Sequence, residues 1–534
     1  MKFIIPLLLF CSFQLLLSQS RAQSVGIGTA SPASSAQLDV SSTSKGFLPP
    51  RMTTAQRNAI SSPAAGLIIF NASNASLEMF DGLYWTPLVK GSTVANNAAV
   101  RKLYGGQGAD NIYAMQPAID GGFFISGSSF SSNSGTLSGI ISNGDLDMWV
   151  MKTDAAGTVE WQRLLGGVSY ESGYSVNATS DGGCILAGIS GNPSGGIFTG
   201  APGLGLEDGL LIKLNATGSV QWYKVYGGSS WDMLYTIQQT ADGGYIACGN
   251  SSSSNTGSLS GINTNGVEDG WIIRIDNAGN ILWQKLLGGN NTDYLYSIAQ
   301  TPDGGYIASG TSSSSNTGTL MGVSNNGSYD AWIIKLDATG NLQWQKLLGG
   351  TSTDYTDGYS GSALKRTTDG GYIIGGYSSS SNSGTLTGLT NNGPVNTTYD
   401  FWIIKLDGFG NLQWQKLLGG SNIERCVAVI QTADGGYVAT GESSSSNSGT
   451  LAGYISNGNV DAWVIKLDNL GNLRWQKLLG GTNPEITNAI VQINGGFALA
   501  GNTGSMGTGY LTGLSSNGGN DGWFFKLDMY GNTY

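Results

Sequence analysis

An acidic residue follows each of seven Gly-Gly pairs at a constant distance. The first glycines of these pairs are Gly105, Gly166, Gly227, Gly288, Gly349, Gly419 and Gly480. The acid lies five residues further on, at Asp110, Glu171, Asp232, Asp293, Asp354, Glu424 and Glu485. Carboxylates at one level of a repeating structure would form a ring that can gather a cation such as Ca²⁺. They could equally cap the backbone N–H groups of their own loop, or pair with the basic residues that every repeat also carries.

The chain of 534 residues contains no histidine. Ser-His-Asp and Cys-His catalysis, a His-ligated zinc site and a histidine pH switch are therefore excluded. No Walker loop, EF-hand loop or Cys-x-x-Cys motif is present either. A carboxylate-based site, or one that uses Lys or Tyr as a base, remains possible. Cys184, Cys248 and Cys426 occupy unrelated places in the repeats, which indicates buried free thiols rather than a disulfide framework.

The fifth repeat is longer than the others. The interval from one Gly-Gly pair to the next is constant along the chain, except that the interval from Gly349 to Gly419 is longer. The additional residues lie around 355–361 and 394–397, in two loops expected on the same face. Aromatic rings beside a carboxylate are typical of a sugar site, although surface loops also accept neutral insertions. We therefore expect a ligand to contact Tyr355, Asp357, Tyr359, Arg366 and Tyr399.

Each repeat contains four segments with the character of short strands. In the copy from Gln284 to Trp344 and just beyond it, they are Tyr296–Thr301, Gly305–Gly310, Asp330–Asp337 and Asn341–Leu348. Asp and Gly between the third and fourth segments predict a tight hairpin turn. A four-stranded unit with apolar residues on both faces needs a neighbour on each side, which radial repetition supplies. The sequence thus predicts an all-β fold, with a seven-bladed β-propeller of four-stranded antiparallel blades over residues 100–534.

The last repeat stops where its fourth strand is due to begin. The matching pattern stands before the first repeat, in Val100–Gly106. We therefore expect Val100–Leu103 to pair beside Trp523–Asp528 and close the ring, which removes the open sheet edges.

Two further features repeat from blade to blade. Twelve of the fourteen tryptophans recur on the third and fourth strands, where they could bind sugar rings but are better explained as packing between blades. The long loops rich in Ser, Asn and Gly, such as Ser251–Leu259, could hydrogen-bond glycans or could simply be solvated turns.

The repeat pattern, G-G-x-x-x-D…D-G-G-Y-I-x-x-G…D-x-W-I-I-K-L-D-x-x-G-N, resembles the seven-bladed propeller (SBBP-type) repeats of bacterial secreted proteins. The resemblance covers residues 100–534. It implies a propeller fold and an exported setting, and that family has no single shared activity.

The N-terminal 99 residues differ in kind. A charged and then apolar start ending at Ala22 predicts a signal peptide over residues 1–22 and no lipid anchor. Residues 23–90 contain a short helix candidate, Thr54–Ile60, followed by a hairpin, and residues 91–99 form a polar linker. The string GFLPPRMTTAQRNAI resembles the N-terminal module of surface and tail-fibre-like proteins of the Bacteroidetes. This resemblance implies an attachment or stalk module, with a trimer as one possibility.

Charge limits the partners. With 25 basic and 35 acidic residues, a formal net charge of −10, the chain is not expected to bind nucleic acid or to insert into a membrane. We expect an exported, non-catalytic propeller that binds a glycan or protein partner at the cell surface or outside the cell. The alternatives are a carboxylate-based glycoside hydrolase or lyase and a purely structural surface protein. No cofactor is expected apart from the possible Ca²⁺.

Overall fold

A computed structural model describes residues 25–27, 29, 31, 38–44, 46–72, 76–80, 85–87, 100–201, 203–356, 362–505 and 507–533. The chain divides into two compact units, Met1–Asn96 and Asn97–Tyr534. The expected signal peptide and linker lie outside the described residues. Within the described part, no helix is both long and apolar enough to span a membrane.

The first unit is small and contains two short sheets. β1 (Val25–Ile27) pairs in parallel with β2 (Leu38–Val40). The second sheet has the order β3 (Arg51–Met52), β4 (Ile68–Asn71), β5 (Ser76–Phe80) and β6 (Trp85–Pro87).

The predicted helix of this unit is present as α1 (Thr54–Asn58), shorter than expected by two residues. It begins at a capping box, in which the side chains of Thr53 and Gln56 each bond the other residue's backbone N–H. From this helix, Arg57 reaches the buried Glu78 of β5, with 2.7 Å between Nη1 and Oε2. The ion pair ties the helix to the sheet.

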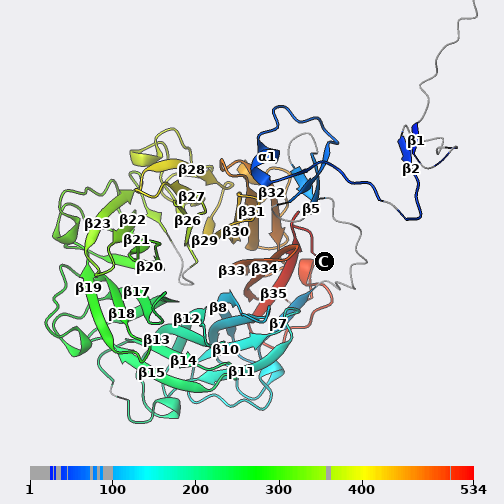
Figure 1. Cartoon of the computed structure of the whole chain (residues 1–534). Helices are drawn as coiled ribbons and strands as arrows, with labels where there is room; N and C mark the ends of the chain where they lie inside the picture. Colours follow the sequence, from blue (N-terminus) through cyan, green and yellow to red (C-terminus); the bar gives the residue numbers. More distant parts are fainter. Residues whose placement is uncertain are drawn as a thin grey trace, which may run out of the picture. The chain divides into compact units, whose positions relative to one another are not determined.

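The second unit is built from repeated antiparallel sheets, seven among its described residues, numbered here in the order of their innermost strands (Figure 1). The innermost strands are β8 (Asp110–Pro117), β12 (Glu171–Ala178), β16 (Asp232–Gln239), β20 (Asp293–Gln300), β24 (Asp354–Tyr355) with β25 (Leu364–Arg366), β29 (Glu424–Gln431) and β33 (Glu485–Ile493). The second strands are β9 (Phe123–Ser129), β13 (Cys184–Ser190), β17 (Tyr245–Ser251), β21 (Tyr306–Ser312), β26 (Tyr372–Ser378), β30 (Tyr437–Ser443) and β34 (Gly496–Thr503).

The outer half of each sheet has the third and fourth strands. The third strands are β10 (Asp147–Thr153), β14 (Asp208–Leu214), β18 (Asp269–Ile275), β22 (Asp330–Leu336), β27 (Asp400–Leu406), β31 (Asp461–Leu467) and β35 (Asp521–Asp528). The outermost strands are β11 (Val159–Leu165), β15 (Val220–Tyr226), β19 (Ile281–Leu287), β23 (Leu342–Leu348), β28 (Leu412–Leu418), β32 (Leu473–Leu479) and β7 (Arg101–Tyr104). Each second-to-third connection contains one 3-10 turn: η1 (Gly135–Leu137), η2 (Gly196–Phe198), η3 (Gly257–Leu259), η4 (Gly318–Leu320), η5 (Gly384–Leu386), η6 (Gly449–Leu451) and η7 (Gly509–Leu511). The predicted all-β, propeller-like class is confirmed.

The sheets form a closed ring. Each innermost strand contacts the innermost strand of the next sheet, and β33 of the seventh sheet contacts β8 of the first. In the seventh sheet, β7 pairs with β35, with Leu103 opposite Trp523 and Lys102 opposite Phe524. This is the pairing that the repeat pattern predicts, and it joins the start of the second unit to its end.

The predicted hairpin turns have the expected chemistry. Between β22 and β23, Oδ1 of Asp337 accepts from the backbone N–H groups of Thr339 at 2.8 Å and Asn341 at 2.9 Å. Gly340 closes the turn with φ of +81°, which glycine adopts without steric cost. The turns therefore fix the register between the third and fourth strands.

The predicted bounds of the four strands differ from the observed ones by up to three residues, most at the first strand. The first strand of the fourth sheet was expected from Tyr296, but β20 begins three residues earlier, at Asp293. The register shifts between Leu295 and Ser297, so Tyr296 is the additional residue of a β-bulge. On the N-terminal side of the bulge, pairing with β21 continues back to Asp293, the acid of the Gly-Gly loop.

The tryptophans pack between sheets. Those of the third strands are at most 1% exposed, as for Trp271, and the Nε1 of Trp271 donates to Gln284 at 3.1 Å. On the outermost strands, Trp161 lies against the turn of the next sheet at Gly218 and donates to the backbone oxygen of Ala216 at 3.1 Å. The packing interpretation is confirmed at these positions. The three cysteines of the second unit are buried and free, as expected.

Candidate functional site

Tyrosines occupy the bulge of four consecutive innermost strands. In each strand the register shifts around one residue, and those residues are Tyr113, Tyr174, Tyr235 and Tyr296. Bulges re-aim a side chain relative to the regular strand. Successive rings lie 5.5, 5.5 and 5.4 Å apart between centroids, so they form a continuous arc across four sheets. In the sixth and seventh sheets the bulge residues are Val427 and Asn488, which end the arc.

A second tyrosine cluster lies at the fourth and fifth sheets. Tyr329 stacks on Tyr355 with 5.4 Å between ring centroids, and Tyr377 lies 5.1 Å from both Tyr355 and Tyr399. The guanidinium of Arg425 lies over the rings of Tyr377 and Tyr399, at 5.7 and 6.0 Å from their centroids. Arg425 also pairs with Glu442 at 2.8 Å.

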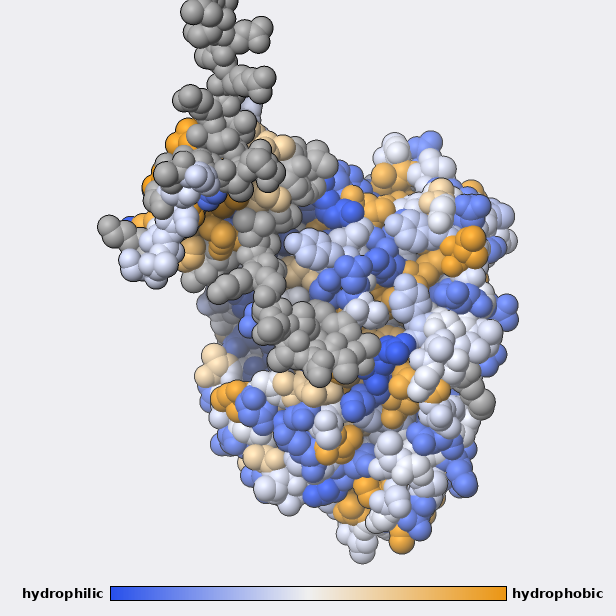
Figure 2. Space-filling model, turned by 90° about the vertical axis from the view of Figure 1, so that its right-hand side faces the viewer, coloured by the Kyte–Doolittle hydropathy of each residue, from blue (hydrophilic) through white to orange (hydrophobic). Residues whose placement is uncertain are grey.

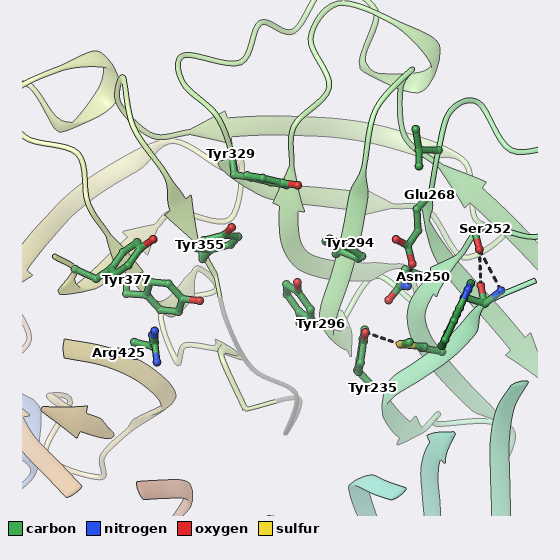
Figure 3. A pocket seen from close by; sticks show the side chains of 14 residues that line it. Tyr235, Asn250, Ser252, Glu268, Tyr294, Tyr296, Tyr329, Tyr355, Tyr377 and Arg425 are labelled. Atoms are coloured by element: carbon green, nitrogen blue, oxygen red, sulfur yellow. Dashed lines mark hydrogen bonds between the residues drawn. The ribbon is translucent and has the colours of Figure 1, made fainter. Parts of the chain in front are cut away.

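Two residues of the arc, Tyr235 and Tyr296, and the tyrosines of the second cluster line one cavity of about 730 Å³, which we call the tyrosine pocket (Figure 3). Its lining residues are Trp231, Met233, Tyr235, Asn250, Ser252, Val267, Glu268, Tyr294, Tyr296, Tyr329, Tyr355, Tyr377, Tyr399 and Arg425. Figure 3 shows the rings around an open space, with Arg425 on the side opposite Glu268. Burial raises the pKa of Glu268, and the side-chain amide of Asn250 donates to its carboxylate.

The chemistry of the pocket suits a ligand with apolar faces and hydroxyl or charged edges. Tyrosine rings offer stacking surfaces and phenol groups that both donate and accept hydrogen bonds. One basic and one acidic side chain can fix the orientation of a ligand. Among the described lining residues, Glu268 is the one carboxylate, whereas hydrolysis of a glycosidic bond ordinarily uses two.

The structure brings together two of the five predicted contact residues. Tyr355 and Tyr399 line the tyrosine pocket, where the unpredicted Tyr377 bridges them. Asp357 and Tyr359 lie outside the described residues. Arg366 ends β25 at the opposite end of the innermost strand, and its Nη1 donates to the backbone oxygen of Gln300 at 3.1 Å. It lines a second, smaller cavity instead.

The acids that follow the Gly-Gly pairs hold their own loops. All seven are at most 2% exposed, and each accepts the backbone N–H of the second glycine of its pair, as Asp232 does from Gly228 at 2.7 Å. Oδ2 of Asp232 also accepts from Ser253 at 2.7 Å, and Ser251 donates to Oδ1. These contacts establish loop capping, one of the roles that the sequence allowed. The described residues contain no group of three or more acids or cysteines arranged for a metal ion, and Ca²⁺ binding stays a prediction.

A second acid faces each of these carboxylates. It is the first residue of the third strand in every sheet: Asp147, Asp208, Asp269, Asp330, Asp400, Asp461 and Asp521. In all seven, Oδ1 is buried and has no hydrogen-bond partner among the residues that the structure describes. A Cβ added to Gly227 would lie 2.6 Å from Oδ1 of Asp208 and 2.8 Å from Oδ2 of Asp232, so both oxygens lie close to its Cα. Burial, and then the charge of Asp232, raise the pKa of Asp208 to about 6.

The basic residue of the third strand does not pair with the acid of the Gly-Gly loop, which was one of the alternatives that the sequence left open. Lys213 lies 2.8 Å from Asp181, in the turn between β12 and β13, and Lys335 lies 2.8 Å from Asp303 in the equivalent turn. The suggestion that these bases neutralise the acids of the Gly-Gly loops is therefore wrong. Lys213 is the next-to-last residue of β14, so it lies at the opposite end of the strand from Asp208 and the Gly-Gly loop.

Among the comparisons with known protein families, one match lies in the N-terminal part of the chain. A family model described as a phage tail-like trimerisation region matches residues 26–99. The match confirms the phage tail-like character of this segment. No curated protein matches the chain.

Solved structures with a related arrangement are distant. The WD40 domain of Pan2 from Neurospora crassa is 10% identical, with a TM-score of 0.41, and the match covers 83% of this chain and 94% of that one. Sqt1 from Chaetomium thermophilum is 11% identical, with a TM-score of 0.39 and coverage of 80% and 100%. YCF48 bound to the D1 peptide is 10% identical, with a TM-score of 0.39 and coverage of 80% and 96%. The sheet order and register described above, rather than these likenesses, establish the propeller-like fold.

Proposed function

We propose that this protein is an exported binding protein without catalytic activity, which holds a glycan in the tyrosine pocket and is displayed as an oligomer through its N-terminal unit. The observation that carries the proposal is the cavity of about 730 Å³ walled by tyrosines from three consecutive sheets, with Arg425 and Glu268 on opposite sides. Sugar rings stack on such faces, while phenol, amide and charged groups bond their hydroxyls.

Comparison of the sheets with one another separates framework from pocket. The acid, the glycines and the buried third-strand residues recur in nearly every sheet, which is expected of groups that the fold needs. Three pocket positions instead change from sheet to sheet. At the position of Arg425, the other sheets have Asn111, Ser172, Met233, Tyr294, Tyr355 and Ile486. At the position of Tyr377, they have Ser128, Ile189, Asn250, Thr311, Glu442 and Asn502. At the position of Tyr399, they have Leu146, Glu207, Glu268, Tyr329, Val460 and Asn520. The fold accepts many side chains there, so it does not require the tyrosines and Arg425, which supports a role for them in binding a ligand.

A protein partner is the second candidate. Arg425 and Glu268 could pair with charges of a peptide segment, and a surface that mixes polar and apolar groups suits a protein. On the face of the second unit that Figure 2 shows, hydrophobic residues are scattered among hydrophilic ones rather than gathered in one area. A protein ligand would therefore be expected to use the pocket rather than a broad apolar face on that side.

Display as an oligomer is supported by the first unit. Apolar side chains of this unit are exposed in a single chain, among them Val25 at 56%, Phe47 at 68% and Leu48 at 68%. Copies of the chain could cover them, in line with the trimerisation family that this segment matches. Several pockets on one assembly would strengthen weak binding through avidity.

An array of glycans probed with residues 23–534 tests the ligand, and variants test the place. Tyr377→Ser and Arg425→Asn install residues that the first sheet has at the same positions, so the fold should be kept. Each should weaken binding about five-fold or more, because stacking on a sugar ring and charged hydrogen bonds contribute about 1–3 kcal/mol each.

Tyr454→Ser is the matched control, since Tyr454 is 38% exposed on a loop that does not line the pocket. If all three variants bound the glycan as tightly as wild type does, the ligand would bind elsewhere. A protein ligand would be indicated if no glycan binds and a peptide library yields peptides that bind wild type but not Tyr377→Ser. Light scattering of the same protein, with Phe47→Ser as the comparison, tests the oligomer: a wild-type monomer would contradict display as a trimer.

A further inference from the structure

A second cavity, of about 230 Å³, lies at the other end of the innermost strands. β20 shows the relation: Tyr294, near its start, lines the tyrosine pocket, and Gln300, its last residue, lines the second cavity. The lining residues are Gln116, Ser175, Val176, Asn177, Thr236, Ile237, Gln238, Ile298, Ala299, Gln300, Leu364, Lys365 and Arg366. Two of them are basic and none is acidic.

The two basic residues depart from the repeat. At the position of Lys365 the other sheets have Gln116, Asn177, Gln238, Ala299, Ile430 and Val491. At the position of Arg366 they have Pro117, Ala178, Gln239, Gln300, Gln431 and Gln492. The fold therefore does not require a charge at either place.

The ammonium group of Lys365 has no ion pair or hydrogen bond within the part of the chain that the structure describes. The contrast within the same sheet is Lys405, which lies 2.8 Å from Asp369. Lys365 is partly buried, and burial lowers its pKa because the charged form loses hydration. An unneutralised cation in a cavity is costly unless an anion accompanies it.

The amide side chains of the cavity present donors. Oε1 of Gln238 accepts the backbone N–H of Gln300 at 2.8 Å, and Oδ1 of Asn177 accepts the backbone N–H of Gln239 at 3.0 Å. A backbone N–H can only donate, so these contacts fix the amides with their oxygens turned to the strand. Their NH₂ groups are left as donors, in the same cavity as the ammonium and guanidinium groups.

We propose that this cavity binds an oxyanion, the carboxylate, sulfate or phosphate group of a small ligand, between Lys365, Arg366 and the amides of Asn177 and Gln238. All four groups donate, and oxyanions are the acceptors that such a set recognises. The volume of about 230 Å³ exceeds the roughly 30 Å³ that one water takes in the liquid, so a compact anion has room. The site does not depend on the tyrosine pocket.

Calorimetric titration with sodium sulfate, sodium glucuronate and glucose, at constant ionic strength set with chloride, tests the proposal on residues 23–534. Sulfate stands for a free inorganic anion, glucuronate for a carboxylate carried by a sugar, and glucose for a sugar without charge. We expect saturable binding of at least one anion. Any binding of glucose would belong to the tyrosine pocket and should be the same in wild type and Lys365→Gln. Lys365→Gln should weaken that binding about ten-fold or more, because it removes a charged hydrogen-bond donor.

Lys365→Gln and Arg366→Gln install the residues found at the same positions in the third and fourth sheets, Gln238 and Gln300, so both should fold. Lys346→Gln, on the outermost strand β23, makes the same change of charge away from the cavity and should bind like wild type. Protection of Lys365 from an amine-acylating reagent by the bound anion gives a second readout. Equal affinity in wild type and Lys365→Gln, or no saturable binding of either anion to the wild type, would overturn the proposal.

Discussion

Replacing Asp208 by Asn should stabilise the protein at neutral pH and leave it nearly unchanged in acid. Oδ1 of Asp208 is buried without a partner and lies near Oδ2 of Asp232. The pKa of Asp208 is raised from 3.8 to about 6, first by burial and then by the charge of Asp232. The folded protein therefore holds this proton more tightly than the unfolded chain does.

The sign of the pH dependence follows from that difference. A carboxyl group whose folded pKa is raised favours folding below its unfolded pKa, near 4, and loses this contribution as the pH rises through about 6. At about 1.4 kcal/mol per pKa unit, the shift of roughly two units costs up to about 3 kcal/mol above pH 7. Asn carries no charge, and its NH₂ group can donate to Asp232 while its oxygen accepts the backbone N–H of Leu204, as Oδ2 does now at 3.0 Å.

Urea unfolding at pH 4.0 and pH 7.5 measures the effect. We expect the midpoint of Asp208→Asn to exceed that of wild type at pH 7.5, and the two to be close at pH 4.0. Asp145→Asn is the control, because Asp145 is exposed and the same loss of charge occurs there without a buried neighbour. The reasoning would be refuted if Asp208→Asn were less stable than wild type at pH 7.5, or if it differed equally at both pH values.

Three other predictions concern the ring and its loops. Deleting residues 95–104 removes β7, the partner of β35, and should prevent folding or lower the melting temperature sharply; a truncated protein that melts like wild type would contradict ring closure. Gly227→Ala places a Cβ 2.6 Å from Oδ1 of Asp208 and should cost about 1–3 kcal/mol in urea unfolding, whereas an unchanged midpoint would show that the loop has room. If the acids of the Gly-Gly loops bind Ca²⁺, millimolar Ca²⁺ should raise the melting temperature relative to chelator, and Asp232→Asn combined with Asp293→Asn should reduce that rise; no difference between metal and chelator would leave them the capping role alone.

The fold could be predicted because its signals are local and recur. The turn at Asp337–Asn341 and the acid after each Gly-Gly pair look alike in every copy, and a strand pattern repeated at a nearly constant interval leaves few arrangements that bury both faces. Ring closure followed from the same logic, since Val100–Leu103 carries the pattern that the last copy lacks.

The pocket was harder to predict, because it depends on departures from regular pairing. Tyr296 lines the pocket from a bulge, and nothing in the sequence marks it as the additional residue of the strand. The recurrence of Tyr113, Tyr174 and Tyr235 at the same place in successive repeats was a usable signal, but a repeated aromatic residue is more often part of the core. Tyr377 could not be linked to Tyr355 and Tyr399 without the register of the fifth sheet.

The acid pairs illustrate a different limit of sequence reasoning. Asp208 begins a strand and Asp232 begins the innermost strand of the next sheet, and only the parallel bridge between Glu207 and Trp231 brings their carboxylates together. An Asp at the start of a strand is ordinarily interpreted as a turn residue, so the sequence does not predict that the two acids lie close together.

The regularity of the ring serves stability and leaves specificity to few positions. Each sheet needs its glycines, its two acids and its buried core, and these are nearly the same throughout. Among the positions that differ are three at one end of the innermost strands and two at the other, where the fifth sheet alone has Lys365 and Arg366. Because the framework recurs whatever these positions hold, side chains there can change without loss of the fold. Such an arrangement lets a repetitive ring acquire a one-sided site through substitutions in the third to sixth sheets and the longer loops of the fifth.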